Sequence, residues 1–223
     1  TSPNGRYGAA VAAIDRSTGQ IIDELRRLGI ERNTLVLFTS DNGSRCDYGP
    51  SNGPLRGTKG TIDEGGIRLP LIAWWPGRVP AGRVSDALIA GMDLLPTFAA
   101  LAGSAAPEDR IIDGVDVIRL LADPDQPSPR ETFFYYGGSH LDAVRDGRWK
   151  LIVGRHRWGK GEDGLCELYD LQNDIGETTN VAKKHPDVVR ELMKRLDQCR
   201  EDLGDAAPVL RTRAGRTWVS EMK

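Results

Sequence analysis

The chain has 223 residues, enough for one large domain or two small ones with a buried core. Its 30 basic and 32 acidic residues leave a formal net charge of −2, which gives no basic field that would attract nucleic acid or an anionic membrane. The hydrophobic share of 39% is too high for a disordered chain, and no apolar run approaches the roughly 18 residues of a membrane span.

The N-terminal third predicts a helix followed by a strand. Apolar side chains recur at helical spacing over residues 6–28, and Gly29 is placed to end that helix. Residues 34–39 form a continuous apolar run bounded by turn formers, which predicts a strand buried on both faces. Such a strand is typical of a parallel sheet flanked by helices, so the segment is expected to be an α/β unit.

A long segment without periodicity follows the predicted strand. Residues 41–66 are rich in Gly, Asn, Pro and Ser, and loops of this length inside a compact domain are usually functional. Residues 69–75 predict a second strand. Asp93 is expected to cap a helix over residues 94–101.

The C-terminal half predicts a small antiparallel sheet and one helix. Asp146-Gly147 is a strong hairpin signal, and His185-Pro186 opens a helix that is expected to end at Gly204. This order of strands and then a helix indicates an α+β layer. The predicted strands are residues 132–136, 141–145, 148–153 and 166–171. The expected divisions are residues 1–123 for an α/β part, 124–204 for the α+β subdomain and 205–223 for a surface tail.

Asp41, Asn42 and Gly43 directly follow the first predicted strand. In open α/β sheets, ligands bind beyond the carboxyl ends of the strands. A carboxylate beside an amide oxygen suits a hard cation such as Ca²⁺ or Mg²⁺. The same triplet is also good turn chemistry, so a plain turn is an open alternative.

Residues 57–68 form a glycine-rich loop that carries one lysine. The glycines allow the backbone to approach another group closely, and Lys59 supplies a compact positive charge suited to an oxyanion. The segment lacks the P-loop pattern. The alternative is a structural loop pinned by an ion pair between Glu64 and Arg68, while Lys59 is the better candidate for a functional role.

Six segments occur in the order of a known family. They are TSDNG (39–43), GPLRGTKG (53–60), EGGIRLP (64–70), AVRDGRWKL (143–151) and ELYDL with ETTN (167–171 and 177–180). Together they closely resemble the type I sulfatases of the alkaline-phosphatase-like superfamily. The resemblance runs in register from about Tyr7 to Leu203, which makes accident implausible. It implies an α/β alkaline-phosphatase-like sheet with flanking helices, incomplete here, followed by the small α+β subdomain.

The resemblance also implies an activity and site residues. Sulfatases hydrolyse sulfate monoesters with a calcium ion, so Ca²⁺ rather than Mg²⁺ is the implied cofactor. Asp41 and Asn42 match the second half of that calcium site. Lys59 matches the lysine that contacts the sulfate and its bridging oxygen. His140 stands where some sulfatases place a substrate-contacting side chain.

The family's nucleophile has no counterpart in the sequence. Sulfatases use a formylglycine made from Cys or Ser in a C/S-x-P-S/A-R motif, and the neighbours of Cys46, Cys166 and Cys199 do not match it. The family's paired aspartates, arginine, second lysine and two histidines are also missing. In sulfatases all of these lie upstream, so the chain is expected to be the C-terminal portion of a sulfatase that needs the upstream part to complete its site.

Two other functions stay open. The first is a phosphoester or phosphonate hydrolase of the same superfamily. The second is a non-catalytic glycan-binding protein on a sulfatase scaffold, in which Trp74, Trp75, Trp149 and Trp158 stack on sugars. The expected ligand is a small-molecule or carbohydrate sulfate ester, and nucleic acid is not an expected partner.

Overall fold

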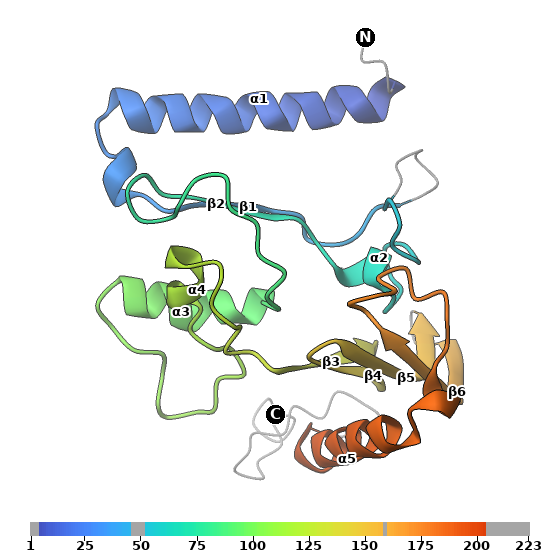
Figure 1. Cartoon of the computed structure of the whole chain (residues 1–223). Coiled ribbons are helices and arrows are strands. Elements are labelled where there is room, and N and C mark those ends of the chain that lie inside the picture. The colour runs from blue at the N-terminus through green and yellow to red at the C-terminus, as the bar shows by residue number, and fades with distance from the viewer. Residues whose placement is uncertain (1–4, 46–51, 158–159, 204–223) are drawn as a thin grey trace, which may run out of the picture.

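The computed structural model of the chain describes residues 5–45, 52–157 and 160–203. A long helix and a two-stranded ribbon lie at one end, and a four-stranded sheet with a covering helix lies at the other (Figure 1). The helices are α1 (Gly5–Arg27), α2 (Glu64–Ile67), α3 (Leu94–Leu101), α4 (Ile118–Ala122) and α5 (Pro186–Leu203), with 3-10 turns η1 (Glu31–Asn33), η3 (Gly91–Asp93) and η4 (Ala182–Lys184). The strands are β1 (Val36–Thr39), β2 (Leu71–Trp74), β3 (Thr132–Gly137), β4 (His140–Asp146), β5 (Trp149–Arg157) and β6 (Lys160–Asp170).

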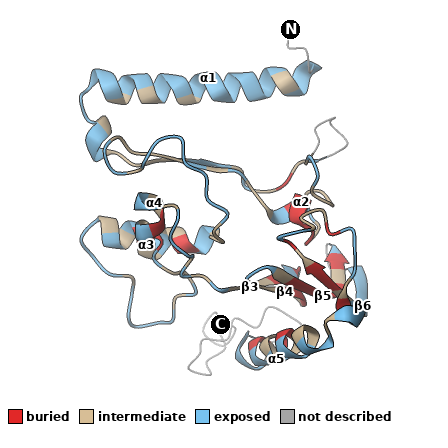
Figure 2. Cartoon of the chain, in the orientation of Figure 1, coloured by how far each residue is buried: buried red, intermediate tan, exposed pale blue. Residues whose placement is uncertain are grey.

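Helix α1 confirms the helix predicted from apolar spacing, and Gly29 follows it with a φ of +69°, the left-handed conformation that glycine favours after a helix. None of its residues is buried, and Val11, Ile14 and Ile21 are about half exposed (Figure 2). Among the described helices, none is both long enough and apolar enough to cross a membrane.

The two N-terminal strands form an antiparallel ribbon. Val36 of β1 faces Trp74 of β2, and Thr39 faces Leu71. The expected burial of β1 on both faces in a parallel sheet is therefore wrong for the described chain. Phe38 and Thr39 are exposed because, within the described residues, β2 is the one strand that pairs with β1 and no helix covers both faces.

Asp93 precedes α3 as predicted, but its carboxylate does not cap that helix. Instead it is fully buried, accepts hydrogen bonds from the backbone amides of Ala90 and Val115, and pairs with the Arg130 guanidinium. The difference has a physical cause, because a buried carboxylate is stabilised more by a charged partner and two amides than by a cap alone.

The C-terminal sheet is antiparallel in the order β3-β4-β5-β6, and α5 covers one face. Alternate residues point to opposite faces, as in any strand. On the covered face, Val144, Leu151 and Leu168 pack against Leu192 and Leu196 of α5. Each fully buried leucine contributes about 1.5–3 kcal/mol to folding, so this face holds the main core (Figure 2).

The opposite face of the sheet receives the glycine-rich loop. Ala143, Ile152 and Tyr169 are buried there, and Ile62 packs on them from the loop. The subdomain boundaries at residues 123 and 204 remain predictions, and the tail at 205–223 lies outside the described residues.

Candidate active site

The segment after β1 crosses the glycine-rich loop at close range. The Gly43 amide donates to the Gly66 carbonyl at 3.0 Å, and the Lys59 amide donates to the Ser44 carbonyl at 3.0 Å. A side chain at Gly43 would collide with the Gly65 carbonyl, so the crossing requires glycine at that position. The crossing therefore holds the Asp41-Asn42 segment beside the segment that carries Lys59.

Asp41 and Asn42 lie directly beyond β1, as predicted. Asn42 donates through Nδ2 to the Gly43 carbonyl at 3.0 Å, and its own carbonyl accepts from Ser40 Oγ at 2.9 Å. Within residues 5–45, 52–157 and 160–203, no donor is bonded to the Asp41 carboxylate or to Asn42 Oδ1. These side chains offer oxygen atoms to a cation, but far fewer than the six to eight that Ca²⁺ takes.

Lys59 is half-buried between two residues in left-handed conformations, Gly57 at a φ of +82° and Gly60 at +87°. Its carbonyl accepts a hydrogen bond from Arg157 Nη2 at 3.0 Å, which ties the loop to the end of β5. The Lys59 ammonium itself makes no hydrogen bond or ion pair with the part of the chain that the structure describes. The loop thus fixes the backbone of Lys59 and leaves its charge available.

A second lysine near this loop has the opposite environment. Lys150 of β5 is fully buried, and its Nζ lies 3.0 Å from Glu64 Oε1, 2.9 Å from Glu177 Oε1 and 2.7 Å from the Ile62 carbonyl. Burial raises the pKa of Glu177 above its ordinary value, although the Lys150 charge opposes that shift. Lys150 therefore fastens the loop to the sheet and is structural.

A chain of ion pairs surrounds the buried lysine. Arg56 lies 3.0 Å from Asp63, Asp63 is 2.5 Å from Arg155, and Arg155 is 2.6 Å from Glu167. Burial alone would raise the pKa of Asp63, but hydrogen bonds and positive charge from Arg155 and Arg56 hold it below its ordinary value. Arg56 also donates to the Glu177 carbonyl at 2.7 Å. These charges keep residues 56–64 in one position against β5 and β6.

The predicted ion pair between Glu64 and Arg68 is present but long. Arg68 Nη1 lies 3.9 Å from the Glu64 carboxylate, whereas Lys150 Nζ lies 3.0 Å from it. Arg68 Nη2 is closer to Asp86, at 3.2 Å. Sequence reasoning missed the roles of Lys150 and Arg157. Lys150 stands in the AVRDGRWKL segment, but that segment indicates a hairpin and does not show which side chains Lys150 contacts, and Arg157 stands in no recognised motif. Their roles depend on contacts about 90 residues away in the chain, to Glu64 (86 residues) and Lys59 (98 residues).

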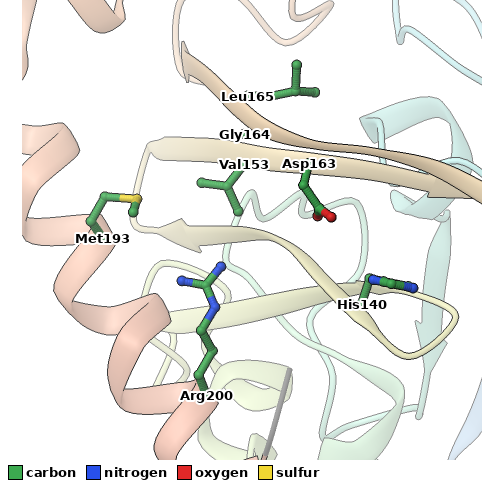
Figure 3. A pocket seen from close by; sticks show the side chains of 7 residues that line it. All are labelled: His140, Val153, Asp163, Gly164, Leu165, Met193 and Arg200. Atoms are coloured by element: carbon green, nitrogen blue, oxygen red, sulfur yellow. The ribbon is translucent and has the colours of Figure 1, made fainter. Parts of the chain in front are cut away.

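His140 begins β4 and lies in a different group of side chains. Its ring stacks on that of His156, with centroids 3.8 Å apart and planes 9° from parallel. It also lines a cavity of about 390 Å³ with Asp163 and Met193, among others (Figure 3). Among the described residues, no hydrogen bond, ion pair or ring contact joins His140 to Lys59 or Asp41.

The cysteines offer no nucleophile in the described part of the chain. Cys199 is buried on α5, where burial raises the pKa of its thiol, and Tyr136 Oη lies 3.4 Å from its sulfur. Cys166 is an exposed free thiol. Its sequence neighbours, Leu165 and Glu167, are not basic and form no nucleophile motif. Cys46 lies outside the described residues.

Trp75 and Trp149 have protein partners in the described chain. The Arg78 guanidinium lies 4.8 Å from the centre of the Trp75 ring, and Trp75 Nε1 donates to the Arg32 carbonyl at 2.8 Å. Arg148 lies 5.0 Å from the centre of the Trp149 ring. Trp158 lies outside the described residues.

Comparison with known proteins gives two family matches. Residues 2–104 match the model described as sulfatase, and residues 58–202 match the model described as N-sulphoglucosamine sulphohydrolase, C-terminal. The two matches overlap across the loop that carries Lys59.

The proteins similar to the chain include several sulfatases and a phosphonate monoester hydrolase from Agrobacterium radiobacter, whose crystal structure has a TM-score of 0.59 at 24% identity, over 86% of this chain and 40% of that one. The chain is 44% identical over 194 residues to the N-acetylgalactosamine-6-sulfatase of the dog, Canis lupus familiaris. That match includes 83% of this chain and 36% of the dog protein. It is 43% identical over 152 residues to human steryl-sulfatase, with 65% of this chain matched to 26% of that protein. A crystal structure of a sulfatase from Pseudoalteromonas has a TM-score of 0.79 at 25% identity, over 87% of this chain and 42% of that one. The chain thus spans little more than a third of the first of these curated relatives.

Proposed function

The chain belongs to the sulfatase family, and from that premise we propose that its protein hydrolyses a sulfate monoester to an alcohol and inorganic sulfate. The observation that carries the proposal is the crossing of two loops beyond β1. There Ser44 and Lys59 share a backbone hydrogen bond of 3.0 Å, and Asp41 and the Lys59 ammonium lack partners in the described chain. Unpaired groups of opposite charge, held by close-packed glycines, are what a site for a metal and an anion requires.

Asp41 and Asn42 are proposed to contribute to a calcium site. The atoms that would bind the metal are the Asp41 carboxylate oxygens and Asn42 Oδ1, which have no hydrogen-bond partner in the described chain. Such oxygen ligands fit Ca²⁺ and do not fit a metal that prefers sulfur or imidazole. When bound, the ion would neutralise charge on the sulfate oxygens. The remaining oxygen ligands must come from outside these two residues, because Ca²⁺ takes six to eight.

Lys59 is proposed to bind the ester through its ammonium. As the bond between sulfur and the bridging oxygen breaks, negative charge grows on that oxygen, and a nearby ammonium stabilises it more than the intact ester. The Arg157–Lys59 hydrogen bond and the Lys150 cluster, which is Lys150 with Glu64, Glu177 and the Ile62 carbonyl, hold the loop in place. Lys59 therefore needs little reorganisation at the moment of reaction.

The nucleophile is proposed to come from a segment preceding the chain. Neither Cys166 nor Cys199 has the neighbours of the formylglycine motif, and Cys199 is buried. The complete enzyme is therefore proposed to join this chain with an upstream part that supplies the formylglycine and the missing calcium ligands.

The substrate is proposed to be a carbohydrate or other small-molecule sulfate ester. In support, the similar proteins include an N-acetylgalactosamine-6-sulfatase and a steryl-sulfatase. A substrate contact by His140 rests on family resemblance alone. A glycan-binding protein without activity is disfavoured, because Arg78 and Arg148 lie against the rings of Trp75 and Trp149.

The competing enzyme is a phosphoester or phosphonate hydrolase. A sulfatase can be distinguished from this competitor by measuring kcat/KM of the complete enzyme on 4-nitrophenyl sulfate, 4-nitrophenyl phosphate and a 4-nitrophenyl phosphonate. The proposal expects the sulfate to be the preferred substrate. A higher kcat/KM on the phosphate or phosphonate would contradict it.

A further inference from the structure

We propose that His140, His156 and Asp163 form a site for a divalent transition-metal ion such as Zn²⁺, separate from the proposed calcium site. One potential ligand atom from each side chain lies within 4.8 Å of the other two. The residues come from three neighbouring strands, β4, β5 and β6, so the sheet itself brings them together.

A buried carboxylate orients one of the histidines. Asp142 is fully buried, and its Oδ1 lies 2.6 Å from His156 Nδ1 while its Oδ2 accepts from the His156 backbone amide at 2.7 Å. This contact places the proton on Nδ1 and leaves the lone pair on Nε2, which lies 3.9 Å from Asp163. A carboxylate that holds a histidine in this way is the usual support of a metal-ligating imidazole.

The backbone is shaped around that carboxylate. A side chain at Gly137 would collide with Asp142 Oδ2, and one at Gly154 would meet Oδ1 at 2.8 Å. The two glycines lie on β3 and β5, on either side of β4. The Asp142 carboxylate therefore fits in the sheet because these two strand positions are glycines and carry no side chain.

The donor set selects the class of metal. Two imidazoles and one carboxylate suit Zn²⁺, Ni²⁺ or Cu²⁺, and do not suit Ca²⁺ or Mg²⁺, which prefer oxygen atoms alone. Tetrahedral Zn²⁺ with bonds of about 2.0–2.1 Å separates its ligand atoms by roughly 3.3–3.4 Å. In this structure the rings of His140 and His156 are 9° from parallel, so their in-plane lone pairs do not converge on one ion. Binding therefore requires the half-buried His140 side chain to turn, together with that of Asp163, which is 79% exposed.

The cavity beside these residues leaves room for a further ligand. It measures about 390 Å³, and His140 and Asp163 line it together with the apolar side chains of Val153 and Met193 (Figure 3). Three protein ligands with an open fourth position is the arrangement in which zinc keeps a water molecule or an exchangeable ligand. Arg200 also lines the cavity, and its guanidinium is paired with Asp197 at 3.0 Å.

The alternative is a protonated His156 between two aspartates. In that case the imidazolium pairs with Asp142 and Asp163, and no metal is needed. The two explanations differ in whether Zn²⁺ binds and in which residues its affinity depends on.

The test is calorimetric titration with Zn²⁺ of a protein that contains the whole 223-residue chain. The sample is first freed of metal with a chelator and then kept in saturating Ca²⁺. We expect one tight Zn²⁺ equivalent whose dissociation constant rises 10-fold or more in His140→Asn and Asp163→Asn, with no change in His185→Asn, a histidine outside the group. Asp163→Asn should keep the fold, because its side chain is exposed. Titration with Co²⁺ should give visible absorption bands in the wild type that weaken in the same two variants.

Absence of Zn²⁺ binding, or equal affinities in all four proteins, would overturn the proposal. No substrate enters this measurement, so its failure leaves the sulfatase proposal untouched. If His140→Asn lowers kcat/KM while Zn²⁺ affinity stays unchanged, His140 contacts substrate and the metal site is wrong.

Discussion

Lys59 and Lys150 show how position decides the role of one residue type. Lys150 has no exposed surface and contacts two carboxylates and a carbonyl, so its charge is fully paired within the fold. Lys59 is half-buried, and its ammonium has no partner among the described residues. Of these two lysines, Lys59 is therefore the one that can bind an anion from outside the chain.

Replacing Lys59 by alanine in the complete enzyme should lower kcat/KM by on the order of 10²-fold or more, the scale of removing one preorganised charge stabiliser. The thermal unfolding temperature should change little, because no ion pair within the described chain is lost. Steady-state kinetics and thermal unfolding on the same samples measure both effects.

The matched control is Lys160→Ala, which removes an exposed lysine at the start of β6. It should keep the wild-type kcat/KM. If Lys59→Ala instead keeps near-normal kcat/KM and unfolds early, the lysine supports the loop and has no role in binding.

Asp41→Asn should weaken calcium binding by about 10-fold or more, because ligand charge is a main determinant of Ca²⁺ affinity. Asp187→Asn, which changes an acidic residue in the first turn of α5, should leave the affinity unchanged. Calorimetric titration of the complete enzyme gives the dissociation constants. Equal values for both variants would mean that the segment after β1 is a turn and nothing more.

At the scale of elements, the loop holding Lys59 is fixed by the sheet it lies on. Ile62 packs on Ile152 and Tyr169, and the Lys150 cluster and the Asp63 ion pairs surround that contact. The site loop and the C-terminal sheet thus form one structural unit, although they are about 90 residues apart in sequence, for example Ile62 and Lys150 (88 residues).

Lys150→Met should lower the free energy of unfolding by about 3–5 kcal/mol, because it leaves Glu64 and Glu177 as buried carboxylates without their central partner. Lys160→Met, on the exposed end of β6, should change it by less than about 0.5 kcal/mol. Adding Glu177→Gln to Lys150→Met should recover part of the loss. Urea denaturation measures all three, and a loss below about 1 kcal/mol in Lys150→Met would contradict the role given to the cluster.

Periodicity predicts most of the elements correctly. The apolar spacing over residues 6–28 matches α1, and the hairpin signal at Asp146-Gly147 joins β4 to β5, with Gly147 at a φ of +54°. The apolar pattern does not predict that β5 continues past Val153 or that β6 begins before Cys166. Residues 154–157 and 160–164 mix glycine with charged side chains, and their pairing depends on the neighbouring strand more than on an apolar pattern.

The site is predictable only where its chemistry is local. Asp41, Asn42 and Lys59 stand in motifs with a recognisable order, so the sequence points to them. The Asp142–His156 contact and the Lys150 cluster depend on which strands become neighbours. Asp93 likewise precedes a helix as a cap would, yet Arg130 determines where its carboxylate lies.

At the scale of the whole molecule, the two ends differ in burial. The C-terminal sheet and α5 enclose a core, whereas α1 has no buried residue and β1 and β2 pair with each other alone in the described chain (Figure 2). Exposed apolar side chains such as Ile14, Ile21 and Ile72 lie on this N-terminal part. This pattern supports the proposal that an upstream part of the protein packs against it and completes the site.

The central claim is that the chain supplies a cation-binding pair and one anion-binding lysine to a sulfatase site whose nucleophile lies upstream. The most direct measurement compares release of 4-nitrophenol from 4-nitrophenyl sulfate by the 223-residue chain alone and by the same chain extended upstream. We predict turnover by the extended protein and none by the chain alone. Turnover by the chain above a heat-inactivated control, or none by the extended protein, would contradict this claim.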